Sequence, residues 1–360
     1  MRNNRFVERL YLHTAFLLCL CIAFSFLTGC MGPEQEGKLT AEGMQLLENG
    51  DVDGALSAFA GAEDQNENKT ALLRGRGMAY MAKADYASAI DSFENALAAA
   101  DERMPETKDD IRLYLLSALY REGLYDRVPE VAQEITDSET LPEVQYFLGA
   151  SCLQQGDTAQ ARQYFDRAIA ISPRDYSLYL QIYETYEDCM MTAVGDEYLQ
   201  TALLIIPSSS EDNYRVGQIY YYLGRYDDAR NVLNGPFEEG YAPAVELMGE
   251  VYLSSGDYTH ARAVFEDILS RNGENPAVYN GLALCAIREG NYDQALASIE
   301  QGLALEEEEG KQQLLFNEII VYEYKLDFET ACNKAEAYCG MYPTDTDASR
   351  ELEFLRSRVR

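Results

Sequence analysis

Two stretches of the chain, Gly256-Asp257-Tyr258-Thr259-His260-Ala261 and Gly290-Asn291-Tyr292-Asp293-Gln294-Ala295, are near copies of one another. Looser copies also occur, and the closing residues of the whole set are Ala55, Ala89, Val128, Ala161, Ala229, Ala261, Ala295 and Ala331. Spacing alone places one further copy, which ends at Gly195. The steps between successive closing positions are then 34, 39, 33, 34, 34, 32, 34 and 36 residues. A period of this size is typical of stacked repeats, which expose long surfaces and therefore favour binding over catalysis.

Each period has the features of two helices joined by a tight turn. Apolar residues recur at helical spacing, as at Leu148, Cys152 and Phe165. The Gly of the recurring string suits the left-handed residue that ends one helix, and the following Asp or Asn suits the cap of the next. No run alternates at period two between turn signals, so we expect no strands. A single pair cannot offset its own chain entropy, so neighbouring pairs must stack.

The fourth unit shows the full pattern: Leu148-Gly149-x-x-Cys152, then Gly156, Ala161, Phe165, Ala168 and Pro173. This pattern resembles the tetratricopeptide repeat. Its small position 8 is matched by Gly43, Gly77, Gly149, Gly217 and Gly249, its aromatic position 24 by Phe59, Phe93, Phe165 and Phe265, and its proline position 32 by Pro173, Pro207 and Pro343. The resemblance implies an all-α fold, a right-handed α-solenoid of about nine helix pairs over residues 36–345. Residues 346–360, acidic at the start and Arg-rich at the end, are expected to form a C-terminal capping helix.

The N-terminus has the features of a targeting signal. Arg2, Arg5 and Arg9 precede an apolar stretch that ends in Leu27-Thr28-Gly29-Cys30. This ending resembles the bacterial lipoprotein box, which implies cleavage of a signal peptide, residues 1–29, and lipidation of Cys30. Residues 30–35 would then be a short tether, and the protein would be lipid-anchored at the extracytoplasmic face of a bacterial cell membrane. An uncleaved membrane helix is the alternative for the apolar stretch.

The chain is strongly acidic, with 29 Lys and Arg against 61 Asp and Glu. Removing residues 1–29 removes three Arg and one Glu, which leaves 26 against 60 and a net charge of −34. Nucleic acid is thereby excluded as a partner, because phosphate binding needs clustered cations. Basic partners fit this charge, although acidity can also serve solubility alone.

The residues that carry catalytic or metal chemistry are scattered. Once the signal is removed and Cys30 is acylated, five Cys remain, and we interpret them as small apolar core residues, with a cross-helix disulfide left open. His260 is the one His of the mature chain, and its place in the turn predicts exposure. No spacing of His, Cys or carboxylates fits a metal site. The sequence therefore predicts no catalytic residue, no cofactor and no metal, and the protein is not expected to be an enzyme.

Tyrosine is abundant, with 27 Tyr and no Trp. In tetratricopeptide domains, positions 2, 5, 9, 12 and 13 of each first helix line the concave groove. In this chain that register selects a partner-binding groove of Tyr120, Tyr146, Glu184, Glu187, Tyr214, Tyr221, Tyr222, Glu250 and Tyr324. About half of the tyrosines are expected to pack between repeats.

An aromatic and acidic groove suits an extended peptide with basic or apolar side chains. The predicted function is a non-catalytic, membrane-anchored scaffold that binds such segments of envelope proteins. The alternative is a binder of a cell-wall or carbohydrate ligand, because acidic and aromatic side chains also hold sugars.

Overall fold

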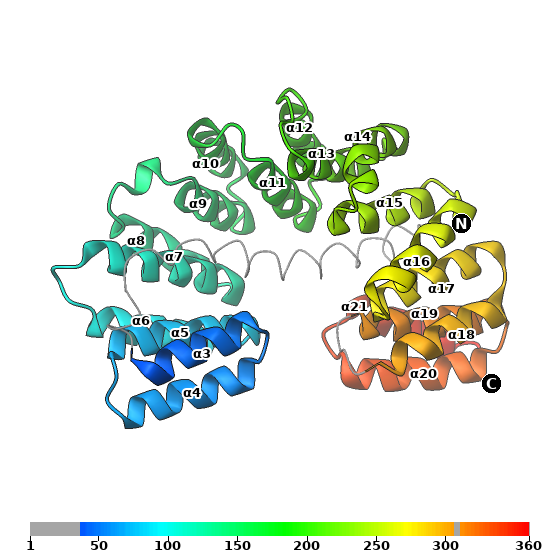
Figure 1. Ribbon diagram of the computed structural model, residues 1–360, viewed down its shortest axis with the longest axis horizontal. Coiled ribbons are helices and arrows are strands. Elements are labelled where there is room, and N and C mark those ends of the chain that lie inside the picture. Colours follow the sequence, from blue (N-terminus) through cyan, green and yellow to red (C-terminus); the bar gives the residue numbers. More distant parts are fainter. Residues whose placement is uncertain (1–36, 306–309, 360) are drawn as a thin grey trace. The chain divides into compact units, whose positions relative to one another are not determined.

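The computed structural model of the chain describes residues 37–305 and 310–359, and these residues contain helices and no strands (Figure 1). The first helices of the successive pairs are α3 (Lys38–Glu48), α5 (Lys69–Ala82), α7 (Pro105–Glu122), α9 (Pro142–Gln154), α11 (Tyr176–Asp188), α13 (Ser210–Tyr222), α15 (Ala242–Ser254), α17 (Pro276–Glu289) and α19 (Lys311–Tyr324). The second helices are α4 (Val52–Asp64), α6 (Tyr86–Ala99), α8 (Val128–Gln133), α10 (Thr158–Ile171), α12 (Thr192–Ala202), α14 (Tyr226–Glu238), α16 (Tyr258–Asn272), α18 (Tyr292–Leu303) and α20 (Phe328–Met341). A last helix, α21 (Thr346–Arg356), follows them. The all-α repeat fold predicted from the sequence is confirmed.

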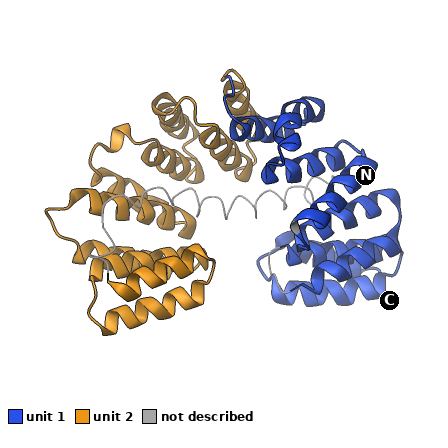
Figure 2. Ribbon diagram, viewed as in Figure 1, with its two compact units in different colours: residues 1–22, 206–360 blue, residues 23–205 orange. Residues whose placement is uncertain are grey.

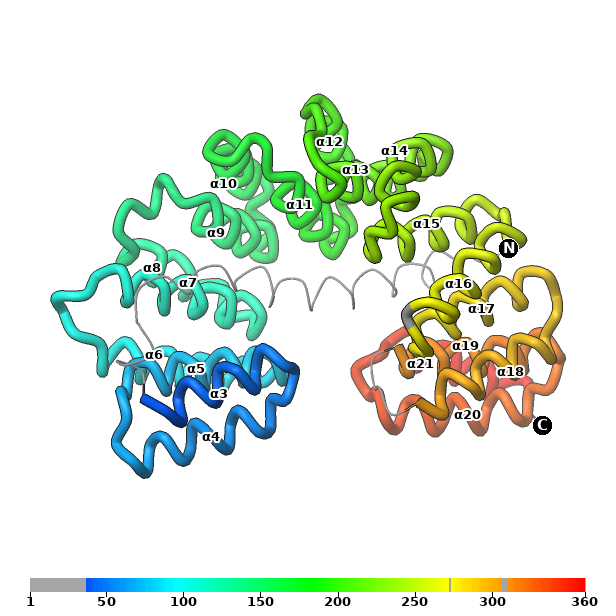
Figure 3. The backbone as a smooth tube through the Cα atoms, in the orientation of Figure 1, coloured from blue at the N-terminus to red at the C-terminus, as the bar shows by residue number. Residues whose placement is uncertain are grey.

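The helix pairs fall into two units (Figure 2). The described part of one unit, residues 37–205, contains the five pairs from α3 to α12. The described part of the other begins at Ile206 and contains the four pairs from α13 to α20 together with α21. The backbone trace shows the same helix–turn–helix alternation throughout both units (Figure 3).

First helices form a continuous row inside each unit. In residues 37–205, α3, α5, α7, α9 and α11 each pack against the next member of the series. From Ile206 onward, α13, α15, α17 and α19 do the same. Second helices instead pack against their own first helix and against the first helix that follows in the same unit. Each unit therefore has two different surfaces, one made by its first helices and one made by its second helices.

Glycines on several first helices leave space that phenylalanine rings from the second helices fill. A Cβ atom placed on Gly43, Gly77, Gly149 or Gly249 would lie 2.6, 2.4, 2.8 and 2.8 Å, respectively, from a ring atom of the Phe sixteen residues later. These rings, Phe59, Phe93, Phe165 and Phe265, are almost completely buried. The two helices of these pairs can therefore approach closely only because position 8 is glycine.

The turns follow the recurring string. In the fourth pair Gly156 has φ 86°, and the Asp157 carboxylate accepts a hydrogen bond from the Gln160 backbone N–H at 3.0 Å. The same cap recurs at Asp51, Asp85, Asp257 and Asp327. Three pairs place a side chain at the left-handed position instead of Gly: Ala84, Met190 and Leu326. These three carry a conformational cost that glycine avoids.

The third pair departs most from the regular pattern. Its first helix, α7, begins with Pro105 at the first helical position and runs for 18 residues. Its second helix is a 3-10 turn, η2 (Tyr125–Arg127), followed by only six residues of α8 and, after a loop, by η3 (Ser138–Thr140). The segment before α7 explains the long step of 39 residues that the sequence places here.

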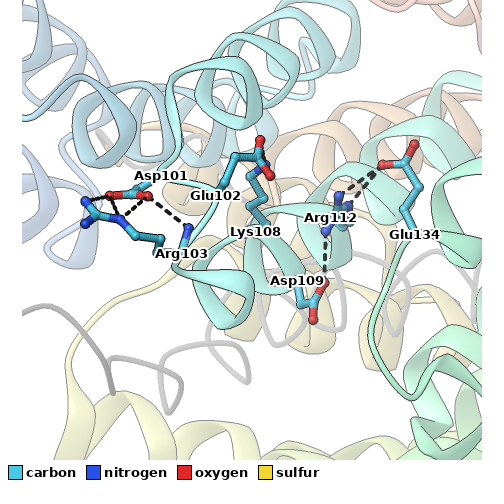
Figure 4. Close-up of polar contacts among 7 residues, drawn as sticks. All are labelled: Asp101, Glu102, Arg103, Lys108, Asp109, Arg112 and Glu134. Atoms are coloured by element: carbon cyan, nitrogen blue, oxygen red, sulfur yellow. Dashed lines mark hydrogen bonds and ion pairs between the residues drawn. The ribbon is translucent and has the colours of Figure 1, made fainter.

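Ion pairs organise this longer connection (Figure 4). Arg103 binds Asp101 at 2.6 Å, which holds the pKa of the Asp101 carboxyl below its usual value, and Lys108 pairs with Glu102. On α7, Arg112 joins Asp109 at 3.0 Å and Glu134 at 3.1 Å. Arg112 therefore ties the first helix to the short second helix of the same pair.

The last helix closes the chain of repeats. Ala348, Leu352 and Leu355 of α21 are buried in a cluster with Ala335 and Tyr338 of α20. An outward ion pair, Arg356 to Glu336 at 2.8 Å, joins the same two helices. The helix thus has an apolar inner face and a charged outer face, as a cap requires.

No helix within the described residues is long and apolar enough to cross a membrane. The predicted signal peptide, the lipidated Cys30 and the tether lie outside these residues.

Candidate protein-interaction surface

The predicted groove residues of the first unit lie on α7, α9 and α11. Tyr120 is partly buried in the last turn of α7, where its hydroxyl accepts a hydrogen bond from Gln154 at 3.4 Å and its ring lies 5.6 Å from that of Tyr125. Burial raises the pKa of Tyr120 to about 12. Tyr146 is also partly buried, with its hydroxyl 2.9 Å from Thr185 Oγ1 on the next first helix. Both rings bridge neighbouring repeats and expose only part of their surface.

The two acidic groove residues of α11 have different surroundings. Glu184 is partly buried. Glu187 is only 9% exposed, and its Oε1 accepts a hydrogen bond from the Tyr183 hydroxyl at 3.2 Å. Burial and the nearby Glu187 together raise the pKa of Asp196 on α12. Glu187 therefore belongs to the interior of the fifth pair.

On α13 the tyrosines form a connected aromatic group. Tyr214 and Tyr222 are partly buried, whereas Tyr221 is buried and its hydroxyl lies 3.1 Å from Ser254 Oγ on α15. The Arg215 guanidinium lies 5.3 Å from the centre of the Tyr214 ring. Tyr214 and Tyr222 thus keep part of their surface exposed, and Tyr214 lies beside a cation.

Glu250 of α15 is buried, whereas Tyr324 of α19 is exposed. Glu250 is 7% exposed, and it lies close enough to Cys285 to contribute to the raised pKa of that buried thiol. Tyr324 is 48% exposed, and its ring stacks on Tyr292 of α18 with centroids 5.6 Å apart and planes inclined by 4°. Tyr324 is the most accessible of the nine predicted residues.

The prediction of an accessible groove residue is therefore wrong for Glu187, Tyr221 and Glu250. They occupy positions 9 and 12 of their repeats, and the direct packing of first helix on first helix covers them. The other six predicted residues keep partial or full exposure: Tyr120, Tyr146, Glu184, Tyr214, Tyr222 and Tyr324. Whether they bind a partner stays a prediction.

Comparison with known families agrees with this geometry. Tetratricopeptide-repeat families match the chain at residues 40–105, 142–175 and 252–314. The matched ranges cover whole helix pairs in both units, and those in the first unit include the contacts of Gly43, Gly77 and Gly149 with phenylalanine rings. The chain is built from tetratricopeptide repeats. No curated protein matches it.

Several solved structures are similar to this chain at low identity. The APC/C hetero-tetramer Cut9–Hcn1 is 15% identical with a TM-score of 0.42; the match covers 84% of this chain and only 59% of that one. The type IV pilus biogenesis factor PilW is 16% identical with a TM-score of 0.43, covering 59% of this chain and 98% of PilW. Pseudomonas aeruginosa PilF is 21% identical with a TM-score of 0.37, covering 58% and 95%. The function is therefore argued below from this chain's own residues.

The first helices of this tetratricopeptide-repeat protein also carry exposed acids beyond the nine predicted groove residues. Glu143 on α9, Asp188 on α11, Glu211 on α13 and Glu246 on α15 are all exposed. They occupy groove positions 2, 5 and 13 and sit among the partly exposed tyrosines. The repeat register itself selects these positions.

One surface hollow lies in the second unit, beside the turns of the sixth and seventh repeats. Its volume is about 580 Å³, and its lining includes Arg225, Arg230, Ser254 and Asp257. Arg225 binds Asp228 at 2.7 Å, and Arg230 pairs with Asp227. Because these arginines are neutralised by neighbouring carboxylates, the hollow has no net attraction for an anion.

The described residues hold no cluster of His, Cys, Asp and Glu suited to a metal ion. Among residues 37–305 and 310–359 the cysteines are free thiols: Cys152, Cys189, Cys285, Cys332 and Cys339. His260 is exposed as predicted, and its Nδ1 lies 2.7 Å from the Asp257 carboxylate that caps α16.

Proposed function

We propose that this protein is a non-catalytic scaffold that binds extended, basic segments of envelope proteins along its first helices. It would be anchored through a lipid on Cys30 at the extracytoplasmic face of a bacterial membrane. The observation that carries the proposal is the alternation of exposed acids and partly exposed tyrosines on the first helices of each unit.

The chemistry of that row supports a cationic partner. Tyrosine offers a large contact area together with one polar group, which suits the centre of a binding surface. Glu143, Asp188, Glu211 and Glu246 add negative charge around these rings. Long-range attraction from a mature chain of net charge −34 would speed the encounter with a basic segment. Binding should therefore weaken as the salt concentration rises.

Site-specific photo-crosslinking in cells tests the binding surface. A photoreactive phenylalanine derivative replaces Tyr222 or Tyr324 on the first helices, and a matched control replaces Tyr258, a partly exposed tyrosine on the second helix α16. We expect the same partner protein to crosslink from both first-helix sites and not from the control. Equal crosslinking from Tyr258, or binding of soluble glycans without protein crosslinks, would overturn the proposal.

The membrane anchor needs a separate test. The Cys30→Ser variant should lose incorporation of labelled palmitate, whereas a Cys339→Ser control should keep it. A native chain that carries no label and retains residues 1–29 would favour the uncleaved helix.

A further inference from the structure

The turn between α19 and α20 carries an exposed leucine in a left-handed backbone conformation. Leu326 has φ 61°, and its side chain is 73% exposed. In the unit that begins at Ile206, the other three turns between paired helices have glycine at this place, namely Gly224, Gly256 and Gly290. A side chain is strained in this conformation, and an exposed leucine gains little from packing. Neither the backbone nor the core of the ninth repeat therefore favours leucine here.

A second apolar surface lies in the same turn. Tyr324 is 48% exposed, and its ring stacks on Tyr292 at the start of α18 with centroids 5.6 Å apart. Between Tyr324 and Leu326, the Lys325 ammonium group pairs with Asp293 of α18 at 2.6 Å. The ring stack and the ion pair both connect this turn to the eighth repeat, so they hold the two exposed side chains in place. We call Tyr292, Tyr324 and Leu326 the turn patch.

The corresponding place between the sixth and seventh repeats is open. In the repeat register, Tyr226 corresponds to Tyr292, and Ser254 corresponds to Tyr324. Tyr226 and Ser254 both line the hollow of about 580 Å³ described above. Serine thus leaves a polar hollow where the ninth repeat places a ring, and glycine follows where the ninth repeat places leucine. The turn patch therefore presents apolar surface where the sixth and seventh repeats present a hollow.

Acids surround the turn patch. Asp293, Asp327 and Glu329 are exposed beside it, and the neighbouring cation, Lys325, is already paired with Asp293. The hydrogen bond from Lys325 holds the pKa of the Asp293 carboxyl below its usual value, which keeps this carboxylate ionised at neutral pH. An apolar surface with acidic surroundings suits an apolar side chain that has Lys or Arg next to it. Anionic lipid, by contrast, is repelled by these carboxylates.

We propose that the turn patch binds an apolar side chain of a partner segment in which Lys or Arg flanks that side chain. This inference rests on the proposed function and specifies the partner further, since basic residues alone would not satisfy the patch. Strained residues are retained where function requires them, and the strain at Leu326 then belongs to binding.

Peptide binding to the full chain tests this inference. The probe is a short fluorescent peptide of alternating Lys and Leu, and its matched control has Ser in place of each Leu and therefore the same charge. Leu326→Gly removes the apolar side chain and relieves the backbone strain. Met190→Gly is the control variant, because Met190 is also left-handed and exposed but has an acid, Asp188, in the place of Tyr324.

We expect the native chain to prefer the Lys–Leu peptide. Leu326→Gly should lower the affinity for this peptide about tenfold and leave the affinity for the Lys–Ser peptide unchanged. Its Tm should equal or exceed that of the native chain, whereas a purely structural leucine would lower Tm on removal. Met190→Gly should leave both affinities unchanged. Leu326→Asn, which keeps a residue that tolerates the left-handed conformation, should weaken Lys–Leu binding as Leu326→Gly does.

The other outcomes separate this inference from the proposed function. Equal affinity of the native chain for the two peptides would overturn the turn patch and leave the binding of basic segments intact. Failure of both peptides to bind would overturn both proposals. Binding to phosphatidylglycerol vesicles that is lost in Leu326→Gly would overturn the protein partner in favour of a lipid surface.

Discussion

In the fourth and fifth repeats the two helices of a pair approach closely because a glycine on one helix faces a large ring on the other, but the glycine and the ring exchange helices between the two repeats. In the fourth, Gly149 on the first helix receives the Phe165 ring from the second helix. In the fifth, the large residue is Tyr183 on the first helix, and Gly195 on the second helix leaves room for it. A Cβ atom on Gly195 would lie 3.0 Å from the Tyr183 ring and 3.1 Å from its backbone oxygen.

Both repeats thus keep the close contact between their two helices, although the glycine and the large ring stand at different positions. The fifth repeat also replaces the glycine turn with Met190 at φ 58°, and its second helix has no side-chain cap. Buried aromatic residues take over part of the stabilisation there. Tyr186 and Tyr198 stack with centroids 5.7 Å apart, and Tyr186 contacts Phe165 of the fourth repeat at 5.4 Å.

Phe165→Ala should have the largest effect on this comparison. The fully buried ring contacts Tyr146, Tyr186 and Tyr198, so its removal leaves a cavity that spans both repeats. We expect a loss of about 3–5 kcal/mol in the free energy of unfolding, measured by urea denaturation. The exposed Gln163→Ala is the control and should change little. A loss below about 1 kcal/mol would show that the fourth repeat does not depend on this ring.

Gly149→Ala and Gly195→Ala should each cost about 1–3 kcal/mol by overpacking, for different reasons. The new methyl at 149 meets the Phe165 ring at 2.8 Å and the Ala161 backbone oxygen only at 3.2 Å, whereas the one at 195 meets the Tyr183 ring at 3.0 Å and two Tyr183 backbone atoms at 3.1 and 3.2 Å. Adding Phe165→Leu should therefore relieve Gly149→Ala, while Tyr183→Leu should relieve Gly195→Ala much less. Double-mutant cycles measure the two couplings. Equal couplings would contradict the proposed exchange of large and small residues.

Removing the N-cap side chain should reduce the stability of the second helix by about 1 kcal/mol more in the fourth repeat than in the fifth. Asp157→Ala removes the hydrogen bond to the Gln160 N–H and should destabilise α10 by about 0.5–2 kcal/mol. The corresponding Met191→Ala in the fifth repeat removes no cap and should cost less. Hydrogen exchange of the first turns of α10 and α12 provides the measurement. Faster exchange in α12 after Met191→Ala than in α10 after Asp157→Ala would contradict this assignment.

The smallest expected effect is an increase in stability. Met190 is 93% exposed and left-handed, so Met190→Gly should relieve backbone strain at little packing cost. After the entropic cost of glycine, about 0.5 kcal/mol of stabilisation should remain. Thermal unfolding should show a small rise in Tm for Met190→Gly and a fall for Gly156→Ala, where φ is 86°. A fall in Tm for Met190→Gly would show that the methionine side chain stabilises the turn.

The sequence predicts most of the fold because helical spacing, turn glycines and aspartate caps are local signals. It identifies the fifth repeat by spacing alone, because the exchange of Tyr183 and Gly195 breaks the motif and is visible only in the contact between helices. The groove is predicted less well for a related reason. The repeat register identifies a face of each first helix, but burial of Glu187, Tyr221 and Glu250 depends on how closely the next first helix packs.

The most direct test of the scaffold proposal compares two sets of charge-neutralising substitutions in the affinity for the crosslinked partner. One set changes the exposed first-helix acids Glu143, Asp188, Glu211 and Glu246 to their amides. The matched set makes the same change at exposed second-helix acids, Asp91, Glu130, Glu266 and Glu300, so that the net charge of both variants is equal. We expect the first set to weaken partner binding at least tenfold, about 1.4 kcal/mol, and the second to leave it nearly unchanged. Equal weakening by both sets would mean that net charge alone draws the partner, and would contradict binding along the first helices.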